Sequence, residues 1–509
     1  MKRRKIIKED YPIKGIKLKY QLEENIKIFK DIFKNDSTIK FRQIKSKSCS
    51  KLKCCIIFAD GMTNREIIND SIVSPITNST INHITSYKNL IDIIIDEGII
   101  SDHVERLESI EKLVEALLSG DSILLFDKVN EGVTVDTKGW KTRALDEPPT
   151  ERIVRGPREG FTESIVVNTS LIRRRIKNSD LRFVFREIGK RTKTQVSICY
   201  IEGIANEKIV EEVFKRIDNI DMDSILESGY IDELIRDAPF SPFKTINYTE
   251  RPDVVAGKIL EGRVAILCDG TPIVLTLPFL FMEYFQVNED YYSGYIFSSI
   301  NRLLRYLAFF ISTSIPAIYV ALITSHQEMI PTPLLLSISS AREGVPFPTI
   351  FEALVMLLVF DLIREGGLRL PEPVGTTVSI VGALVLGEAA VSAKIVSAPI
   401  VIVTAITGIT TFLIYKMTGA LIIIRTIFLL LTAVLGLYGY IFGVIGVVIH
   451  LMSIRSFGIP YMINVGSINK QDLKDTAIRA PWWFMYYRPK LLSSKNAIRR
   501  PYAYKRRSK

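Results

Sequence analysis

The stretch ALIIIRTIFLLLTAVLGLYGYIFGVIGVVIHLM, residues Ala420–Met452, decides the fold class of this chain. It carries one charged residue, Arg425, and one histidine, His450, in thirty-three positions. About 20 apolar residues are enough to cross the hydrocarbon of a bilayer. The chain is mainly apolar from about Leu303 to Ile454, whereas about three hundred mostly polar residues precede this block. The sequence therefore predicts a large soluble part joined to a small membrane bundle.

The fold class expected is an α/β soluble N-terminal region, made of two small α/β subdomains, followed by an α-helical polytopic membrane domain. The expected divisions are a basic mobile arm at 1–53, α/β subdomains at 54–145 and 146–285, a connector at 286–302, a transmembrane helical domain at 303–455 and a basic cytoplasmic tail at 456–509.

The positive charge of the chain is concentrated at its two ends. Residues 1–53 hold seventeen Lys and Arg against six Asp and Glu, and residues 470–509 hold twelve against two. Basic residues that flank apolar spans stay on the cytoplasmic side, so we expect both termini inside and an even number of crossings. The Lys-rich start lacks the interleaved aromatic residues of a nucleic-acid site, and the basic tail directly follows the membrane block. Contact with anionic lipid head groups is the expected secondary role, and no nucleic acid partner is predicted.

The chemistry of a typical enzyme is missing from the sequence. The five cysteines have no zinc-site spacing and are read as reduced thiols. The four histidines form no H-E-x-x-H motif, and the chain has neither a G-x-x-x-x-G-K-[ST] loop nor a G-x-G-x-x-G or G-x-S-x-G motif. We therefore expect no enzyme, no cofactor and no metal site.

Hydrophobic patterning places the elements of the soluble part. A possible helix lies at Gln21–Phe33, a buried strand begins at Cys54, and a helix starts at Thr63–Asn64. Asp102–Leu118 has helical spacing. The remaining expected elements are two strands paired around Asn130–Gly132, strands in 181–189 and 194–203, helices at Glu207–Ile217 and Met222–Arg236, and a hairpin around Asp269–Gly270.

The apolar block is expected to contain four spans. They are Leu303–Ser325, Gly375–Val391, Ile395–Tyr415 and Leu421–Met452, the last roughly 46 Å long at 1.5 Å per residue. Thr349–Arg364 is too polar for a lipid-facing span, because it carries two acids and an arginine, and is expected as an interfacial or re-entrant helix. Six spans remain the alternative, if this helix crosses and the last run splits at Gly436–Gly439.

Ionisable residues inside a membrane block are functional candidates. Glu388 lies in the stretch VGALVLGEAAVSAK, and a stripe of small residues accompanies it at a spacing of four, which allows helices to approach closely. Either the stripe packs helices while Glu388 pairs with Lys394 or an arginine, or copies from several subunits ring a cation-selective path. The pore or gating candidates are Glu388, Gly387, Ala383, Ser379, Glu352, Asp361 and Lys394.

A second unusual stretch, EPPTERIVRGPREGFTESIVVNTSLIRRRIK, interleaves arginines with glutamates in the soluble part. Exposed ion pairs contribute only about 0–1 kcal/mol each, which is little reason for so many. A solvated face, a subunit contact and an anion site all remain open. The subunit-contact candidates are Arg152, Arg155, Arg158, Glu159, Arg173, Arg174 and Arg175.

Several of these stretches together resemble the A subunit of the spore germinant receptors of endospore-forming bacteria. The resemblance covers about residues 54–465 and rests on six motifs: ERIVRGPREGFTES (151–164), NxxLIRRRIK (168–177), RPDVVA (251–256), EGRVAILCDGTP (261–272), REGVPFP (342–348) and GALVLGEAAVxA (382–393).

The resemblance implies a location in the spore inner membrane and a complex with a permease-like B subunit and a lipoprotein C subunit. It also implies a homo-oligomeric ring that releases ions when the partner senses a nutrient, with the connector NEDYYSG coupling the soluble and membrane parts. A scaffold that holds the partner subunits and conducts nothing is the alternative function. A secondary transporter is disfavoured, because inverted repeats of broken helices are not evident.

Overall fold

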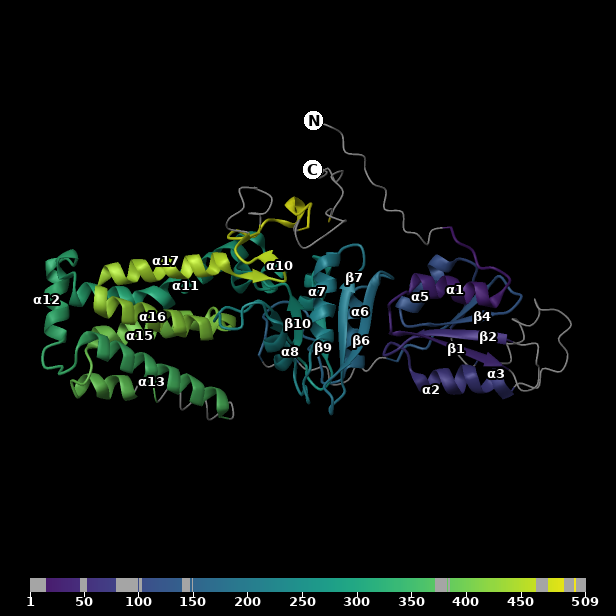
Figure 1. The fold of residues 1–509 in the computed structure, drawn as a ribbon, viewed down its shortest axis with the longest axis horizontal. Helices are drawn as coiled ribbons and strands as arrows, with labels where there is room; N and C mark the ends of the chain where they lie inside the picture. The colour runs from purple at the N-terminus through teal and green to yellow at the C-terminus, as the bar shows by residue number, and fades with distance from the viewer. Residues whose placement is uncertain are drawn as a thin grey trace, which may run out of the picture. The chain divides into compact units, whose positions relative to one another are not determined.

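The structure is a computed structural model that divides into two compact units. It describes residues 15–45, 53–78, 99, 103–139, 147–148, 150–370, 382, 385–463, 475–488 and 499. Unit 1 comprises residues 1–236, 246–278 and 485–509, and unit 2 comprises residues 237–245 and 279–484. Unit 1 contains the two five-stranded sheets, and unit 2 contains the long helices and a two-stranded sheet (Figure 1).

Unit 1 contains a first five-stranded antiparallel sheet with the order β1-β2-β4-β5-β3. Residues along β2 are buried on both faces, because Cys55 and Ile57 join one core cluster while Cys54 and Ile56 join another. In Figure 1, α1 and α5 cover one face and α2 and α3 the other. The elements are α1 Leu22–Ile32, β1 Ile39–Lys45, β2 Lys53–Ala59, α2 Arg65–Ile67, η1 Ile68–Val73, α3 Ser74–Asn78, β3 Val104–Leu107, α5 Ile110–Leu118, β4 Ser122–Phe126 and β5 Gly132–Val135.

Two expectations for this sheet are wrong. The helix expected at Gln21–Phe33 forms as α1, but β1 pairs with β2 from Ile39 to Lys45, so the ordered subdomain begins well before residue 54. A strand was not expected here because the segment is rich in lysine, although charged side chains are common on edge strands. The helix expected from Asp102 begins only at Ile110, because Val104–Leu107 pairs with β5 as the opposite edge of the sheet.

A second five-stranded antiparallel sheet has the order β6-β7-β9-β10-β8. Its predicted strands and the β9–β10 hairpin are confirmed, and α7 and α8 lie where helices were expected. Helices α6 and α9 pack on a face that includes Phe183, Cys199 and Leu267. Neither α6, α9 nor β8 was expected. The elements are α6 Ile165–Arg175, β6 Leu181–Ile188, β7 Thr194–Ile201, α7 Glu207–Asp218, α8 Ser228–Ile235, β8 Asn247–Thr249, α9 Pro252–Leu260, β9 Val264–Cys268 and β10 Val274–Leu277.

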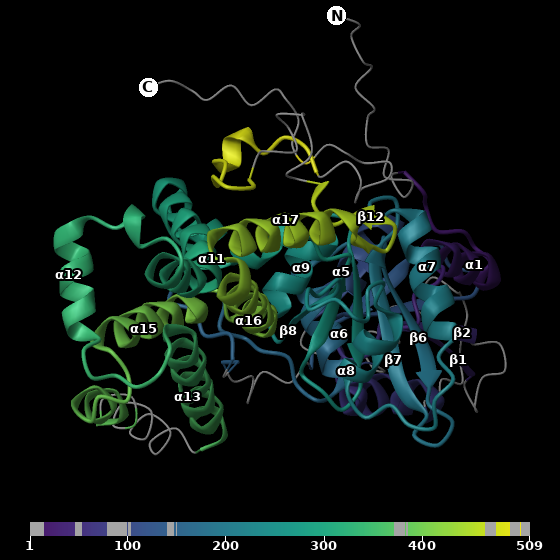
Figure 2. The same ribbon diagram turned by 60° about the vertical axis from the view of Figure 1, so that its left-hand side comes forward.

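Unit 2 is a helical bundle around α11, which packs against α13, α15, α16 and α17. Figure 2 shows α16 and α17 beside one another, with α12 at the rim of the bundle. The elements are η3 Phe281–Phe285, α10 Glu289–Tyr292, α11 Tyr295–Thr324, η4 Gln327–Met329, α12 Thr332–Ala341, α13 Thr349–Arg369, α15 Ala398–Phe412, η5 Tyr415–Met417, α16 Thr418–Leu435, α17 Leu437–Ser453, β11 Arg455–Ser456, β12 Ile459–Pro460 and η6 Trp482–Phe484.

The apolar block differs from the expected set of spans. Within the described residues, two helices are long and apolar enough to cross a membrane, Tyr295–Thr324 and Tyr415–Leu435. The first starts eight residues before the expected Leu303, inside the segment taken as a connector. The long final span is wrong, since the chain breaks at Gly436, whose φ of 58° favours glycine. This is the split of the six-span alternative. The span Gly375–Val391 lies mostly outside the described residues.

Candidate functional site

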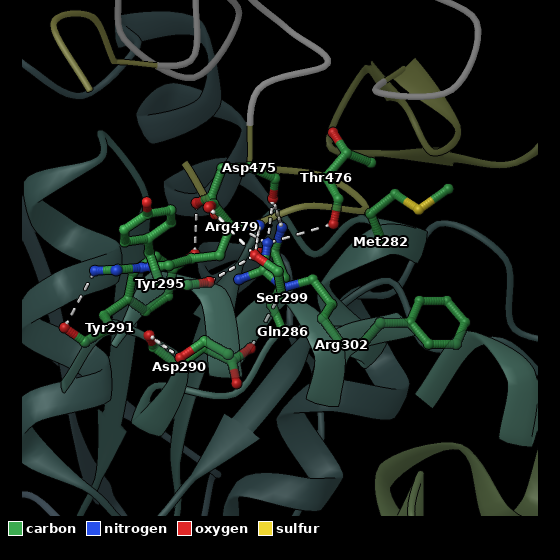
Figure 3. Close-up of polar contacts among 12 residues, drawn as sticks. Met282, Gln286, Asp290, Tyr291, Tyr295, Ser299, Arg302, Asp475, Thr476 and Arg479 are labelled. Atoms are coloured by element: carbon green, nitrogen blue, oxygen red, sulfur yellow. Dashed lines mark hydrogen bonds and ion pairs between the residues drawn. The ribbon is translucent and has the colours of Figure 1, made fainter. Parts of the chain in front are cut away.

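The start of α11 holds a buried polar cluster in unit 2. Arg302 is fully buried, and its Nη1 donates to the carbonyl of Asp475 at 2.7 Å and to the Asp475 carboxylate at 2.9 Å. The same nitrogen lies 3.3 Å from the carbonyl oxygen of Thr476. Figure 3 shows these groups converging on Arg302 from α11 and from the later segment. One guanidinium therefore joins parts of the chain that are far apart in sequence.

Asp290, in the α10 segment of the connector, is the acidic partner on the other side of the cluster. Arg305 binds its carboxylate through two nitrogens, at 2.8 and 3.0 Å. Nε of Arg302 lies 3.4 Å from the same carboxylate, and Ser298 donates to the Asp290 carbonyl at 2.8 Å. Bidentate pairs between arginine and carboxylate fix orientation as well as distance. The connector is thus held against the first turns of α11.

The C-terminal segment completes the cluster through aromatic and polar contacts. Tyr291 donates from its hydroxyl to the Asp475 carboxylate at 2.7 Å, and Gln286 donates to the Asp475 carbonyl at 2.8 Å. The guanidinium of Arg479 lies 5.9 Å from the Tyr291 ring centre and 5.6 Å from that of Trp482. Among the described groups of this cluster, Nη2 of Arg302 and Nε of Arg479 are buried without a hydrogen-bond partner. Such a cluster holds the connector, the start of α11 and the C-terminal segment together.

Two carboxylates predicted as pore candidates are instead used inside unit 2. Glu352 is buried on α13 and accepts from the backbone N–H of Ser397, the residue before α15, at 2.9 Å. Arg342 lies 3.4 Å from its other oxygen. A carboxylate is stabilised at a helix N-terminus. Glu352 therefore connects three helices of the bundle.

Asp361 on α13 forms an ion pair with Arg425 on α16. The two atoms are 2.7 Å apart, and Arg425 is fully buried. Arg364 lies 3.4 Å from the other oxygen of Asp361. Arg425, the single charge in the apolar stretch that predicts the fold class, thus has its partner on another helix, as a charge in an apolar region requires. The sequence identifies Arg425 but not which acid it binds.

Glu388 is placed differently from the other two acids. It is exposed in the single chain, on the helix that precedes α15, with the half-buried Gly387 beside it. Within the described part of the chain, no hydrogen bond or ion pair is formed by its carboxylate, and Lys394 is exposed as well. The Lys394 side chain instead lies beside Gly344. Ser379 and Ala383 lie outside the described residues.

The arginine-rich stretch of unit 1 separates into buried and exposed members. Arg173 is buried, forms an ion pair with Asp36 and donates to Thr38 at 2.9 Å. Its guanidinium also lies 4.9 Å from the ring centre of Phe183, so it joins the segment before β1 to the second sheet. Arg173 is therefore used within the chain. No pattern in the sequence around Asp36 identifies it as the partner of Arg173.

The other members of the stretch lie nearer the surface. Arg175 pairs with Glu159 at 2.7 Å, and Arg174 lies 3.6 Å from the same carboxylate. Arg152, Arg155 and Arg158 are exposed. The structure therefore leaves these last three as surface candidates, while Glu159 is occupied within the chain.

Comparison with known proteins places the chain. The Bacillus/Clostridium GerA spore germination protein family matches residues 27–491. The chain belongs to this family. The membership of the germinant-receptor A-subunit family predicted from the motifs is thereby confirmed. Among the described residues of this GerA-family chain, no group of three or more His, Cys, Asp or Glu could hold a metal ion.

Individual relatives extend over most of the GerA-family chain. Spore germination protein KA of Bacillus subtilis (strain 168) is 43% identical over 481 residues, covering 94% of this chain and 88% of that protein. The uncharacterized membrane protein YfkQ of the same strain is 42% identical, covering 93% and 92%. The crystal structure of the N-terminal domain of the A subunit of the Bacillus megaterium spore germinant receptor GerK3 is 37% identical, with a TM-score of 0.41, and covers 52% of this chain and 98% of that one.

Proposed function

We propose that this protein is the membrane A subunit of a nutrient receptor of spores, and that it oligomerises into a ligand-gated channel for ion release. In this proposal it acts with a permease-like B subunit and a lipoprotein C subunit in the spore inner membrane, with both termini in the cytoplasm. Membership of the GerA family supports the role in germination. The apolar helices Tyr295–Thr324 and Tyr415–Leu435 support insertion in a bilayer.

The observation that carries the channel is the exposure of Glu388. Glu352 and Asp361 bind groups of neighbouring segments of the bundle, whereas Glu388 is exposed on a helix of the apolar bundle. A carboxylate facing lipid is costly, so in a membrane it faces protein or water. In a ring of copies, the Glu388 carboxylates would line a common path and favour cations. In such a ring, the positive charges of Arg152, Arg155 and Arg158 would lie at contacts between the soluble parts of neighbouring subunits.

Coupling in this proposal uses the cluster at the start of α11. A nutrient bound to the partner subunit would shift a two-state bundle. The Asp290, Arg302 and Asp475 contacts tie both the connector and the C-terminal segment to α11. A displacement of either segment would therefore change the contacts of α11.

The experiment has two stages. First, the mass of the detergent-solubilised protein decides whether it forms a ring at all, because a monomer cannot. Second, the oligomer is reconstituted and its conductance recorded for the native chain and for Glu388→Gln. Reduced cation selectivity in that variant supports the carboxylate ring, with Glu365→Gln, an exposed acid already paired with Arg369, as the matched control. An unchanged selectivity in Glu388→Gln contradicts it.

A scaffold that conducts nothing is the second candidate. The observation favouring it is that two of the three acids considered for a pore serve as contacts between helices of one chain. No conductance under any ligand condition, with an intact complex of the three subunits, would favour the scaffold.

A further inference from the structure

The first turns of α11 have the reverse polarity of a helix on the surface of a soluble protein, because their polar side chains are buried and their apolar side chains are exposed. Their polar side chains Ser298 and Arg302 are buried, and Arg305 is turned toward Asp290. The exposed side is apolar and includes Ile296, Phe297, Ile300 and Leu303. A surface helix of a soluble protein places its polar residues outside. The outward face of α11 is therefore apolar from its first turn onward.

The C-terminal segment extends this face with aromatic side chains. The ring of Trp483 lies 5.6 Å from that of Tyr295, and Trp482 donates from its indole nitrogen to the carbonyl of Tyr291 at 3.2 Å. Trp482, Trp483 and Phe484 nevertheless remain 48%, 40% and 51% exposed. Three consecutive large aromatic residues are fixed in place and left uncovered. Such amphipathic rings are enriched at the level of membrane head groups.

The length of α11 places these rings near that level. Its thirty residues span about 45 Å, whereas the hydrocarbon core is about 30 Å thick and the head-group regions bring the bilayer to about 40–45 Å. About ten residues of α11 must therefore extend beyond the hydrocarbon or be accommodated by tilt. Tyr295, against which Trp483 packs, is the first residue of the helix.

We propose that Trp482, Trp483 and Phe484, together with the outward face of the first turns of α11, form an anchor in the head-group layer of an anionic leaflet. The inference rests on the proposed function in one respect, that α11 crosses a bilayer. Charge favours a lipid surface over a second protein, since residues 470–509 hold twelve Lys and Arg against two Asp and Glu. Aromatic rings with one apolar and one polar end, such as indole, are compatible with the head-group layer.

The anchor is joined to the buried cluster by Arg479. Its guanidinium lies over both Tyr291 and Trp482, and its backbone N–H donates to the hydroxyl of Ser299 on α11 at 3.2 Å. The C-terminal segment that carries the anchor thus also contains Asp475, which Arg302 binds. The lipid surface and the connector act on the same turns of α11.

The test uses tryptophan fluorescence in the full-length chain, which contains three tryptophans. The variant Trp140→Phe retains Trp482 and Trp483 as reporters, and the difference between the native chain and Trp482→Phe/Trp483→Phe provides the same signal independently. Each protein is placed in nanodiscs of phosphatidylglycerol mixed with phosphatidylcholine brominated either near the head group or near the methyl end of the chain. We expect the shallow bromines to quench the pair about twofold more than the deep ones.

A second reporter separates this inference from the proposed function. Phe310 is an exposed residue further along α11, and Phe310→Trp, in a chain with the three native tryptophans changed to Phe, reports the hydrocarbon. Deep quenching of Phe310→Trp without any quenching of the native pair leaves the span intact and overturns the anchor, because the aromatic rings are then covered by protein. Loss of both signals overturns the anchor and the membrane span together. Shallow quenching of the pair supports the anchor.

Discussion

Arg302 on α11 donates to both the carboxylate and the backbone carbonyl of Asp475, a residue 173 positions later in the chain. Arg302 is fully buried and Asp475 is partly buried, and the buried Asp290 lies on the other side of the guanidinium. Removing one member of a buried ion pair leaves an uncompensated charge, which costs far more than breaking a surface pair. The stability of unit 2 should therefore respond strongly to this position.

Arg302→Ala should lower the stability of the detergent-purified chain by about 3–5 kcal/mol, because the buried Asp290 and the partly buried Asp475 both lose a charged partner. Thermal unfolding followed by intrinsic fluorescence measures the effect. Arg455→Ala, at an exposed arginine of the same unit, should stay within about 0.5 kcal/mol of the native chain. Equal shifts for the two variants would contradict the role assigned to Arg302.

A double-mutant cycle on Asp361 and Arg425 should give a coupling energy of about 1–3 kcal/mol, since the two side chains are in direct contact between helices. Asp361→Asn, Arg425→Gln and their combination are compared by thermal unfolding in detergent. The same cycle on Glu365 and Arg369, an exposed pair on α13, should give about 0–1 kcal/mol. A coupling for Asp361 and Arg425 no larger than that of the exposed pair would count against a stabilising bond between α13 and α16.

Arg173→Ala should destabilise unit 1 by about 3–5 kcal/mol, because Asp36 is left buried without its cation and the contact with Phe183 is lost. Chemical denaturation of the full-length chain measures this. Arg191→Ala removes an ion pair whose arginine is 84% exposed, and it should have a minor effect. Should Arg173→Ala behave like Arg191→Ala, the joint between the two sheets does not depend on this pair.

Gly436→Ala should destabilise the helical unit by about 1–3 kcal/mol. The backbone there has a φ of 58°, and an added Cβ would lie 2.8 Å from the Cε1 atom of His326 and 2.9 Å from the Cβ atom of Ser325. Gly446→Ala is the matched control, since nothing lies within 4 Å of the added carbon in the helix interior. That substitution should be neutral or stabilising by about 0.5–1 kcal/mol. Thermal unfolding of both variants in the same detergent checks the contrast.

The four described cysteines should resist alkylation in the folded chain. Burial raises the pKa of Cys54 to about 12 and that of Cys55 to about 11, and it raises the pKa of Cys268 to about 12. The thiolate is the reactive form, so raising the pH from 7 to 9 leaves these thiols protonated. Mass spectrometry of Cys49→Ser after iodoacetamide should show no label until denaturant exposes all four sites. Labelling of the folded chain that rises across this pH range would contradict the burial.

Prediction from sequence succeeded where one pattern dominated. The apolar runs around Asp269–Gly270 and Asn130–Gly132 gave the right hairpins, because strand pairing there is local. The edge strands β1 and β3 were missed, since pairing with a distant strand, rather than local propensity, makes Ile39–Lys45 and Val104–Leu107 extended. The break at Gly436 was foreseen only as an alternative, because hydropathy does not register a single positive φ.

For the candidate site too, local patterns were predicted from the sequence and contacts between distant residues were not. The sequence identified the connector NEDYYSG, because a polar segment at the edge of an apolar block is conspicuous. The sequence did not identify Asp475, which follows all of these helices in the chain, as the partner of Arg302. It also did not identify the acid that Arg425 binds. Contacts of that kind follow from tertiary packing. The sequence also did not indicate which of the three candidate acids, Glu352, Asp361 and Glu388, would be exposed.

Unit 1 is completed by residues that are synthesised after unit 2: Arg499 forms an ion pair with Glu261, and Arg488 donates to the carbonyl of Leu260. During biosynthesis the early part of unit 1 must therefore wait, incomplete, until the ribosome has released the last of the helices. The early and late parts can join only if they end up in the same compartment. If the helices cross a bilayer as proposed, a bundle that returned the chain to the opposite compartment would leave unit 1 without its C-terminal residues, so the contacts within unit 1 require an even number of crossings.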